Sequence, residues 1–498
     1  MRPMFRPTCL LLAALGATSA CSASVAPAQA PTQASTEAPE AEVIPADRLQ
    51  ADFDHLYAQL REAHFDLYAR SPKAEYDALF ASMRAGMAAP LPRPEAERRF
   101  RRFVAFGRVA HARIDLPFER WAAYREAGGK ALPLFLRVDG DQVYVLHDLS
   151  GVDAISPGDR VLAVDGRPAL DWLRQLGEQV SADTDYMLFA QMEGLVPLLG
   201  WLAGEVDGVE LTLAGDDGTA RDVWLPARTR VETAAVEAAE PSQGVDLQGR
   251  EAKMLDGGIA YLRPGPFYDI RPEATSPWDR SAFRAFLDGA FEAFRDAGAT
   301  DLLIDLRDNP GGDNSFSDLL VAWFADEPFR FSPAFDIRVS DATVASNRAR
   351  LDGQAADAGN ASAELAALYE GKASGSRVSY PIPLVHPREG DRFDGRVHVL
   401  VNRHTYSNAV SVAAIVQDYG FGRVLGEETS DLATTLGAME QFTLSGTGLV
   451  VGYPKARIVR PSGGIEARGV VPDVVLPRPV VEGAEDPVLL QALALIEE

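Results

Sequence analysis

The chain has 498 residues, longer than one ordinary hydrophobic core can accommodate, which predicts two or three domains. Hydrophobic residues make up 47% of the chain and charged residues 24%, which is a globular composition. The formal net charge of −24 argues against binding to nucleic-acid phosphates and against electrostatic binding to anionic lipid headgroups.

The first twenty residues are typical of a bacterial export signal. A basic start precedes an apolar run over 9–17, which is too short to span a bilayer. The sequence Thr-Ser-Ala-Cys then resembles a lipobox, in which Cys21 becomes the acylated first residue. We therefore expect a signal peptide over 1–20 and a periplasmic or outer-membrane lipoprotein. Thr18 stands where leucine is usual, so ordinary signal-peptidase cleavage is the alternative.

Both cysteines, Cys9 and Cys21, lie in the first 21 residues. Downstream of Cys21 the chain can form no disulfide, no cysteine nucleophile and no cysteine-ligated zinc site. The seven histidines show no HExxH or similar ligand spacing, so we expect no metal and no cofactor.

Residues 21–44 are alanine, proline, serine, threonine and glutamate with little to bury, which predicts a disordered tether. The pattern becomes helical over 45–125, which predicts a small N-terminal helical domain. Apolar residues recur in it at three- and four-residue steps, as at Leu49, Phe53, Leu56 and Leu60. The helices are expected to end near His111.

Residues 130–228 show the pattern of short β-strands. Two apolar runs over 134–138 and 142–146 flank a turn at 139–141. The segment 156–168 reads as a turn, a strand and a second turn, and it resembles part of a PDZ domain. Any small β-rich domain with a Pro-Gly turn is the alternative.

The rest of the chain predicts an α/β unit, which makes the whole a multidomain α/β protein. Residues 228–252 are polar and alanine-rich, which indicates a linker. From 250 to 478 apolar runs alternate with helical stretches, which predicts a catalytic core of the α/β class. The stretch 335–395 is long and irregular, which is typical of a substrate-facing insertion or a partly disordered segment. A tail over 479–498 is expected to carry a C-terminal helix.

Ser407 stands where an apolar strand over 397–401 passes into a helix. At a helix N-terminus, unpaired backbone N–H groups and the helix dipole favour negative charge. A nucleophile whose attack generates an oxyanion needs that environment. The alternative is that Ser407 only caps the helix, as serine commonly does.

A second candidate turn, Asn-Pro-Gly-Gly, follows the apolar strand over 302–306 and contains Gly311 and Gly312. Glycine allows the close approach and the unusual φ angles by which a backbone N–H can point at a substrate oxygen. The alternative is a plain turn that ends a strand.

Together these segments resemble the C-terminal processing (tail-specific) serine peptidases and their relatives, the tricorn core protease and the interphotoreceptor retinoid-binding protein. The matching motifs lie at Ile304–Gly312, Thr405–Ala409, Gln417–Gly420, Gly426–Thr429 and Gly469–Asp473. With the PDZ-like segment, the resemblance covers most of residues 46–478. It implies a crotonase-like α/β catalytic core with Ser407 as the nucleophile and no metal or organic cofactor.

The family divides by the residue that activates the serine. In the processing peptidases a lysine follows the Gly-Glu-x-Thr turn, but this chain has Leu432 there and no lysine until Lys455. The tricorn-like branch uses an N-terminal histidine, and the resemblance implies that role for His111. Only the histidine of that motif is present, and Ala110 stands where the tricorn protease has a serine. A partly buried structural histidine is the alternative reading of His111.

The tricorn-like pattern also has a glutamate shortly before the final Gly-x-x-Pro-Asp, where this chain has Glu466. The resemblance implies that Glu466 holds the imidazole in one tautomer, as carboxylates do in other serine hydrolases. An ordinary solvated carboxylate is the alternative.

We therefore expect a secreted, serine endopeptidase-like hydrolase in which Ser407 attacks a peptide carbonyl, His111 takes its proton and Glu466 orients His111. The oxyanion is expected to bind backbone N–H groups of Gly311 or Gly312 and of Asn408. Expected partners are peptide or protein substrates, with membrane contact only through the lipid anchor. Two non-enzymatic alternatives stay open: a ligand carrier on the same fold, and a peptide-binding scaffold dominated by the PDZ-like domain.

Overall fold

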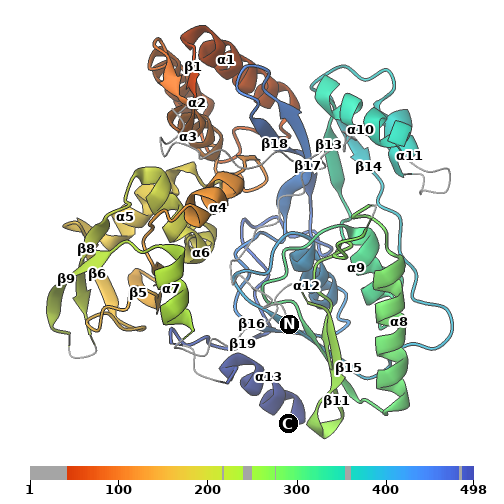
Figure 1. Cartoon of the computed structure of the whole chain (residues 1–498). Helices are drawn as coiled ribbons and strands as arrows, with labels where there is room; N and C mark the ends of the chain where they lie inside the picture. The colour runs from red at the N-terminus through yellow and green to blue at the C-terminus, as the bar shows by residue number, and fades with distance from the viewer. Residues whose placement is uncertain (1–41, 216–217, 239–248, 275, 354–360, 482–484) are drawn as a thin grey trace, which may run out of the picture.

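The computed structural model describes residues 42–215, 218–238, 249–274, 276–353, 361–481 and 485–498. The expected signal peptide, Cys21 and nearly all of the expected tether lie outside the described residues. The described residues form three larger sheets with helices around them (Figure 1).

The first sheet is mostly parallel and lies in the C-terminal half of the chain. Its strands, in spatial order, are β10 (Glu251–Met254), β11 (Ile259–Arg263), β12 (Asp301–Asp305), β15 (Arg396–Val401), β16 (Arg423–Gly426) and β19 (Val474–Val475). Only β10 pairs antiparallel with its neighbour. Strands separated by helices confirm the expected α/β class of this part of the chain.

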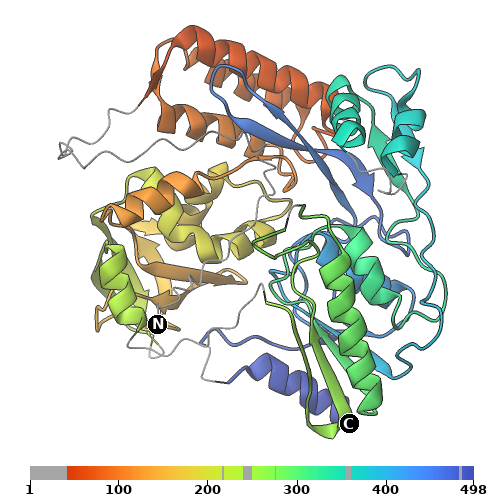
Figure 2. The same cartoon turned by 45° about the vertical axis from the view of Figure 1, so that its right-hand side comes forward.

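Helices cover both faces of this sheet, and its four inner strands, β11, β12, β15 and β16, are accordingly buried on both sides, whereas the edge strands β10 and β19 are largely exposed. One face packs against α8 (Ser281–Asp296), α9 (Asn314–Val321) and α12 (Asn408–Asp418), and the other against α13 (Pro487–Glu497). Side chains alternate between the faces: Leu302 and Ile304 belong to the three-helix side, whereas Leu303 belongs to the α13 side. Figure 2 shows α13 at one end of the molecule beside this sheet.

The second sheet is antiparallel and connects the two ends of the chain. It consists of β14 (Arg377–Tyr380), β13 (Phe335–Arg338), β18 (Val450–Ile458) and β17 (Thr435–Thr443), with β3 (Arg113–Ile114) paired to β18. The stretch 335–395, expected to be irregular, instead contributes two of these strands and two helices, α10 (Asp341–Gly353) and α11 (Ala361–Tyr369).

The N-terminal helices do not form a core of their own. They are α1 (Ala46–Ala63), α2 (Lys73–Ala85) and α3 (Arg93–Ala105), with the short pair β1 (Val43–Ile44) and β2 (Leu91–Pro92) beside them. Their buried residues share one hydrophobic cluster with Leu444, Val451 and Tyr453 of the β17–β18 hairpin. Both figures show this hairpin running along α1. Separated by more than 300 residues of sequence, the two segments therefore fold as one unit.

The third sheet is antiparallel and occupies the region expected to be β-rich. Its strands are β4 (Leu134–Asp139), β5 (Gln142–Asp148), β6 (Arg160–Val164), β7 (Arg167–Pro168), β8 (Gly208–Ala214) and β9 (Ala220–Pro226). The expected strands at 134–138 and 142–146 are present as the β4–β5 hairpin. Four helices accompany the sheet: α4 (Phe118–Glu126), α5 (Ala169–Leu176), α6 (Asp185–Ala203) and α7 (Arg230–Glu237), the last within the segment expected to be a linker.

Helix α6 is long and apolar enough, by length and composition, to cross a membrane. It packs instead in the hydrophobic core of the third sheet, where Leu195, Val196 and Leu199 are buried with Leu134 and Leu136 of β4. This helix is therefore apolar on most sides because it lies inside the protein.

Candidate active site

Three loops that follow adjacent parallel strands meet at one edge of the first sheet. Residues 306–313 follow β12, residues 402–407 follow β15, and residues 427–434 follow β16. The carboxyl ends of parallel strands are the usual place for ligand sites in α/β folds. The predicted glycine turn and Ser407 lie in the first two of these loops.

Ser407 occupies a strained turn directly before α12. Its backbone has φ 53° and ψ −123°, a conformation that residues other than glycine rarely adopt. The Ser407 side chain makes no capping hydrogen bond to the helix, so the capping alternative does not describe this serine. Its side chain is half-buried, and its backbone N–H donates to Asp431 Oδ2 at 2.6 Å. The hydroxyl therefore has the freedom that a nucleophile requires.

Gly311 lies directly against this turn. A Cβ atom at Gly311 would come within 2.8 Å of Ser407 Cβ and 2.7 Å of Asn408 N, closer than real contacts allow. Its φ of +84° is a second reason for glycine at this position. The sequence thus places bare backbone next to Ser407.

The predicted oxyanion donors differ in availability. Gly311 N–H already donates to Asn309 Oδ1 at 2.9 Å, whereas Gly312 N–H has no acceptor within the described parts of the chain. Asn408 is the first residue of α12, where a backbone N–H has no partner inside the helix. The geometry therefore favours Gly312 and Asn408 over Gly311.

His111 is brought to this edge by strand pairing. Two residues after it, β3 pairs with β18, with Arg113 opposite Gly452 and Ile114 opposite Val451. The imidazole stacks on the ring of Tyr406, the neighbour of Ser407, with centroids 5.5 Å apart and an interplanar angle of 21°. No hydrogen bond joins His111 to Ser407 among the described residues, although such bonds often tighten only when substrate binds.

The environment of His111 keeps its imidazole neutral. The side chain is 6% exposed, and its Nδ1 is buried without a hydrogen-bond partner in the described structure. Burial lowers the pKa of His111 to about 4, and the cationic side chain of Arg113 adds to this shift. A neutral imidazole can accept a proton, which is the state that a general base needs.

Glu466 does not reach His111 in this structure. Its side chain is exposed, and no contact between the two residues is present in the described part of the chain. Arg460 anchors the start of this segment to Asp418, the last residue of α12, with Nη2 and Oδ1 2.6 Å apart. An 11-residue helix is about 16 Å long, so this anchor lies at the opposite end of α12 from Ser407. The orienting role of Glu466 stays a prediction.

No lysine contacts Ser407 among the described residues. Leu432, at the position where related peptidases have a lysine, is buried with 2% exposure. Lys455 lies on β18 and donates to Glu440 Oε1 at 2.5 Å, in an ion pair inside the second sheet. Of the two candidate bases, His111 contacts Tyr406, the residue next to Ser407, whereas Lys455 is paired with Glu440 in the second sheet.

Two buried carboxylates in this region were not predicted from the sequence. Asp431 accepts the Ser407 N–H, and Asp183 Oδ2 accepts the N–H of Ala110 at 3.0 Å. Burial raises the pKa of Asp431 to about 7, and the charge of Asp183 adds to the shift. Asp431 follows the Gly-Glu-Glu-Thr motif closely enough to have been noticed, whereas nothing in the sequence around Asp183 indicates its place.

The loop that carries Ser407 is also fixed to the third sheet. Arg403 donates to Glu193 Oε1 on α6 at 2.8 Å and to the carbonyl oxygen of Val138 on β4 at 2.9 Å. His404 Nε2 lies 2.9 Å from the other Glu193 oxygen. These contacts indicate that His404 is a structural partner of Glu193 and not the general base.

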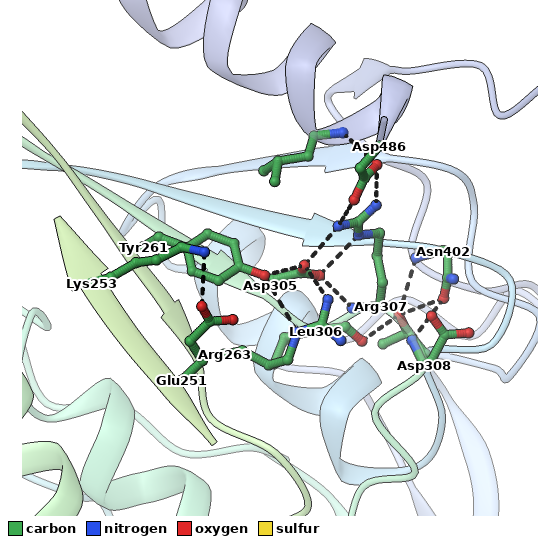
Figure 3. Close-up of polar contacts among 12 residues, drawn as sticks. Glu251, Lys253, Tyr261, Arg263, Asp305, Leu306, Arg307, Asp308, Asn402 and Asp486 are labelled. Atoms are coloured by element: carbon green, nitrogen blue, oxygen red, sulfur yellow. Dashed lines mark hydrogen bonds and ion pairs between the residues drawn. The ribbon is translucent and has the colours of Figure 1, made fainter. Parts of the chain in front are cut away.

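A buried ion cluster supports the loop that carries the glycines. Asp305, at the end of β12, accepts from Tyr261 Oη at 2.8 Å and from Arg263 and Arg307 (Figure 3). Arg307 also bonds both oxygens of Asp486, at 2.9 and 2.7 Å, at the start of α13. Burial opposes the ionisation of Asp305, but the two guanidinium groups outweigh it and hold its pKa well below the usual range.

The fold resembles solved peptidase structures. Mature CPAF superimposes with a TM-score of 0.58 at 17% identity, covering 87% of this chain and 93% of that chain. Mature CPAF complexed with lactacystin gives a TM-score of 0.59 at 17% identity, covering 91% and 97%. A putative peptidase from Parabacteroides merdae gives a TM-score of 0.45 at 14% identity, covering 90% and 96%. At these identities the likeness to CPAF establishes the fold alone.

The sequence itself identifies the family. No curated protein sequence matches the chain, but residues 278–476 match the profile of Peptidase family S41. This match includes the glycine turn, Ser407, Asp431 and Glu466, although not His111. The chain therefore belongs, through this region, to the C-terminal processing peptidases of family S41, and it is a serine peptidase.

Proposed function

We propose that this site cleaves peptide bonds by acyl transfer with Ser407 as the nucleophile. The observation that carries the proposal is the Ser407 turn: a strained backbone at a helix N-terminus, with an uncapped side chain and Gly311 packed against it. A serine that only capped the helix would need neither the strain nor the glycine. These features are those of a hydroxyl presented to a substrate carbonyl.

His111 serves as the general base in this proposal. Its imidazole takes the Ser407 proton as the oxygen bonds to the carbonyl carbon, and it then returns the proton to the leaving amine. The resulting acyl-enzyme is released when water attacks the ester, with His111 again accepting a proton. The stacking of His111 on Tyr406, its buried position and its lowered pKa support this role.

The oxyanion of the tetrahedral intermediate would bind the N–H groups of Gly312 and Asn408, which have no competing acceptor in the described structure. Glu466 would have to move to His111 Nδ1 to orient the base. The unpartnered state of that buried nitrogen supports such a movement. We expect Glu466→Gln to lower turnover less than loss of His111, because it deletes no reacting group.

A fluorophosphonate probe, which labels activated serines, tests the proposal on the purified protein. We expect the wild type to label, and Ser407→Ala and His111→Ala each to lose nearly all labelling and peptide turnover. Because nucleophile and base act as a unit, the double variant should be scarcely worse than either single one. His64→Ala is the matched control, since His64 is also buried with a lowered pKa but lies outside the site. Absence of labelling in the folded wild type would favour the carrier or scaffold alternative.

We also propose export and lipid anchoring at Cys21, on the basis of the signal-like segment that it ends. Radiolabelled palmitate should enter the wild type in a bacterial host but not the Cys21→Ala variant. Equal labelling of both would refute the anchor.

We further propose that the unit over residues 130–228 is PDZ-like and presents long substrates to the site. An antiparallel sheet with β4 at its edge beside α6 supports this proposal. The intact protein should therefore cleave long chains with a higher kcat/KM than short reporters that cannot reach this unit, because remote contacts serve long substrates. Equal kcat/KM values for both substrates would contradict it.

A further inference from the structure

Asp431 is a buried carboxylate bound only to backbone in the region that the structure describes. It is fully buried, and its two oxygens accept different N–H groups: Oδ2 from Ser407 at 2.6 Å and Oδ1 from Leu432 at 2.9 Å. No arginine or lysine forms an ion pair with it in the described residues. A buried carboxylate without a cation is costly, so its presence calls for a reason other than stability.

Asp431 accepts the backbone N–H of Ser407, the residue whose backbone conformation is strained. A backbone conformation such as that of Ser407 persists only where its surroundings determine it. Gly311 packs against this turn through Ser407 Cβ, and Asp431 holds the Ser407 amide. With its own N–H directed to Asp431, Ser407 leaves the next amide, that of Asn408, as the one available to a substrate oxygen.

Asp183 does the same for the segment that carries the base. Its Oδ2 accepts the N–H of Ala110, next to His111, and its Oδ1 accepts from Arg70 Nε at 2.9 Å. The charged or titratable groups that influence Asp431 are Asp183, which precedes α6, and Tyr406, whose own pKa is raised mainly by burial and then by Asp431. The two segments that carry nucleophile and base are thus each fixed through a backbone amide by one of two neighbouring acids.

We propose that Asp431 is a positioning residue of the peptidase site, which holds the Ser407 turn in its reactive conformation by accepting the Ser407 N–H. The proposal rests on the proposed function of Ser407 as nucleophile. If Asp431 were only a structural acceptor, its neutral form would serve equally well. Its replacement would then lower the stability of the protein more than the reactivity of Ser407. A positioning residue gives the opposite pattern, because misplacement of a nucleophile by a fraction of an ångström affects rate far more than folding.

Asp431→Asn and Asp431→Ala test the proposal, because asparagine keeps one acceptor oxygen and alanine keeps none. Asp52→Asn is the matched control: Asp52 is also buried and accepts two backbone N–H groups, of Gly446 at 3.0 Å and Thr447 at 2.6 Å, outside the site. The measurements are the rate of fluorophosphonate labelling and the thermal midpoint, each between about pH 5 and about pH 8.

We expect Asp431→Asn to slow labelling by about 10- to 100-fold and Asp431→Ala by more, while Asp52→Asn labels at the wild-type rate. The folded-state pKa of Asp431, about 7, lies above that of a free carboxyl, so its contribution to stability is lost as pH rises through that value. The midpoint of Asp431→Asn should therefore gain on that of the wild type as pH rises.

Wild-type labelling rates in folded Asp431→Asn would overturn the positioning role, as would equally slow labelling of Asp431→Asn and Asp52→Asn at equal losses of thermal midpoint. If Asp431→Ala does not fold, the comparison of the two asparagine variants still decides. Failure of the proposed function looks different: the wild type itself would not label, or Ser407→Ala would label like the wild type.

Discussion

The contact between Gly311 and Ser407 makes a prediction whose size follows from the geometry. Gly311→Ala adds a Cβ within 2.8 Å of Ser407 Cβ and within 2.7 Å of Asn408 N and of the Tyr406 carbonyl oxygen. Alanine at positive φ costs about 1 kcal/mol, and forced overpacking adds about 1–3 kcal/mol. The lost free energy of unfolding should therefore be about 3 kcal/mol, with Ser407 displaced by the new methyl group.

Gly420→Ala separates the two contributions. Gly420 also has positive φ, +72°, but nothing lies within 4 Å of its Cβ position, so only the backbone cost of about 1 kcal/mol applies. Urea unfolding gives the two stabilities, and fluorophosphonate labelling reports the serine. We expect Gly311→Ala to label about 100-fold more slowly than wild type and Gly420→Ala to label normally. Equal stability and equal labelling of the two variants would refute the reasoning.

Three further predictions concern other groups. Burial lowers the pKa of His111 to about 4, so kcat/KM should rise with pH through an apparent pKa well below that of an ordinary histidine. A rise in kcat/KM centred near about pH 6.5 would contradict this prediction. Arg307→Met leaves Asp305 with one fewer cation and leaves Asp486 without its partner. Urea unfolding should therefore show that the free energy of unfolding falls by about 3–5 kcal/mol, more than for Asp486→Asn. An equal fall for both variants would show that Asp305 needs no second cation. Lys455→Met should lower stability through the loss of its pair with Glu440 yet leave the labelling rate intact, and slow labelling in the folded variant would reopen the question of the base.

Local sequence patterns were sufficient to predict much of the architecture. The β4–β5 hairpin and the strands β12 and β15 appear where apolar runs between turn residues predict them. The glycine turn and Ser407 were also predictable, because each follows a parallel strand and such strand ends gather at one edge of the sheet. The spacing of apolar residues and the positions of turn residues are local properties of the sequence, and these elements depend on little else.

Long-range pairing explains what the sequence could not show. The N-terminal helices pack on the β17–β18 hairpin, so their apolar faces indicated helices but not the partner that buries them. Asp183 and Asp431 are ordinary polar residues in sequence, and only the fold makes them neighbours that raise the pKa of Asp431. The family motif gives the position of Glu466 in the chain. The place in the fold where the segment before Glu466 starts depends on a long-range contact, the ion pair between Arg460 and Asp418.

The docking of the third sheet on the serine loop constrains how substrate can enter. Arg403 and Glu193 are each at most 3% exposed in their side chains, and their pairing spans the serine loop and α6. Replacing either residue by an apolar one would leave the other charge buried and unpaired, at a cost of about 3–5 kcal/mol. The pair therefore holds the unit over 130–228 against the loop that carries Ser407, and we expect a long substrate to pass along the surface of this unit. The same contact ties any shift of α6 to the loop that presents the nucleophile, because Arg403 lies four residues before Ser407.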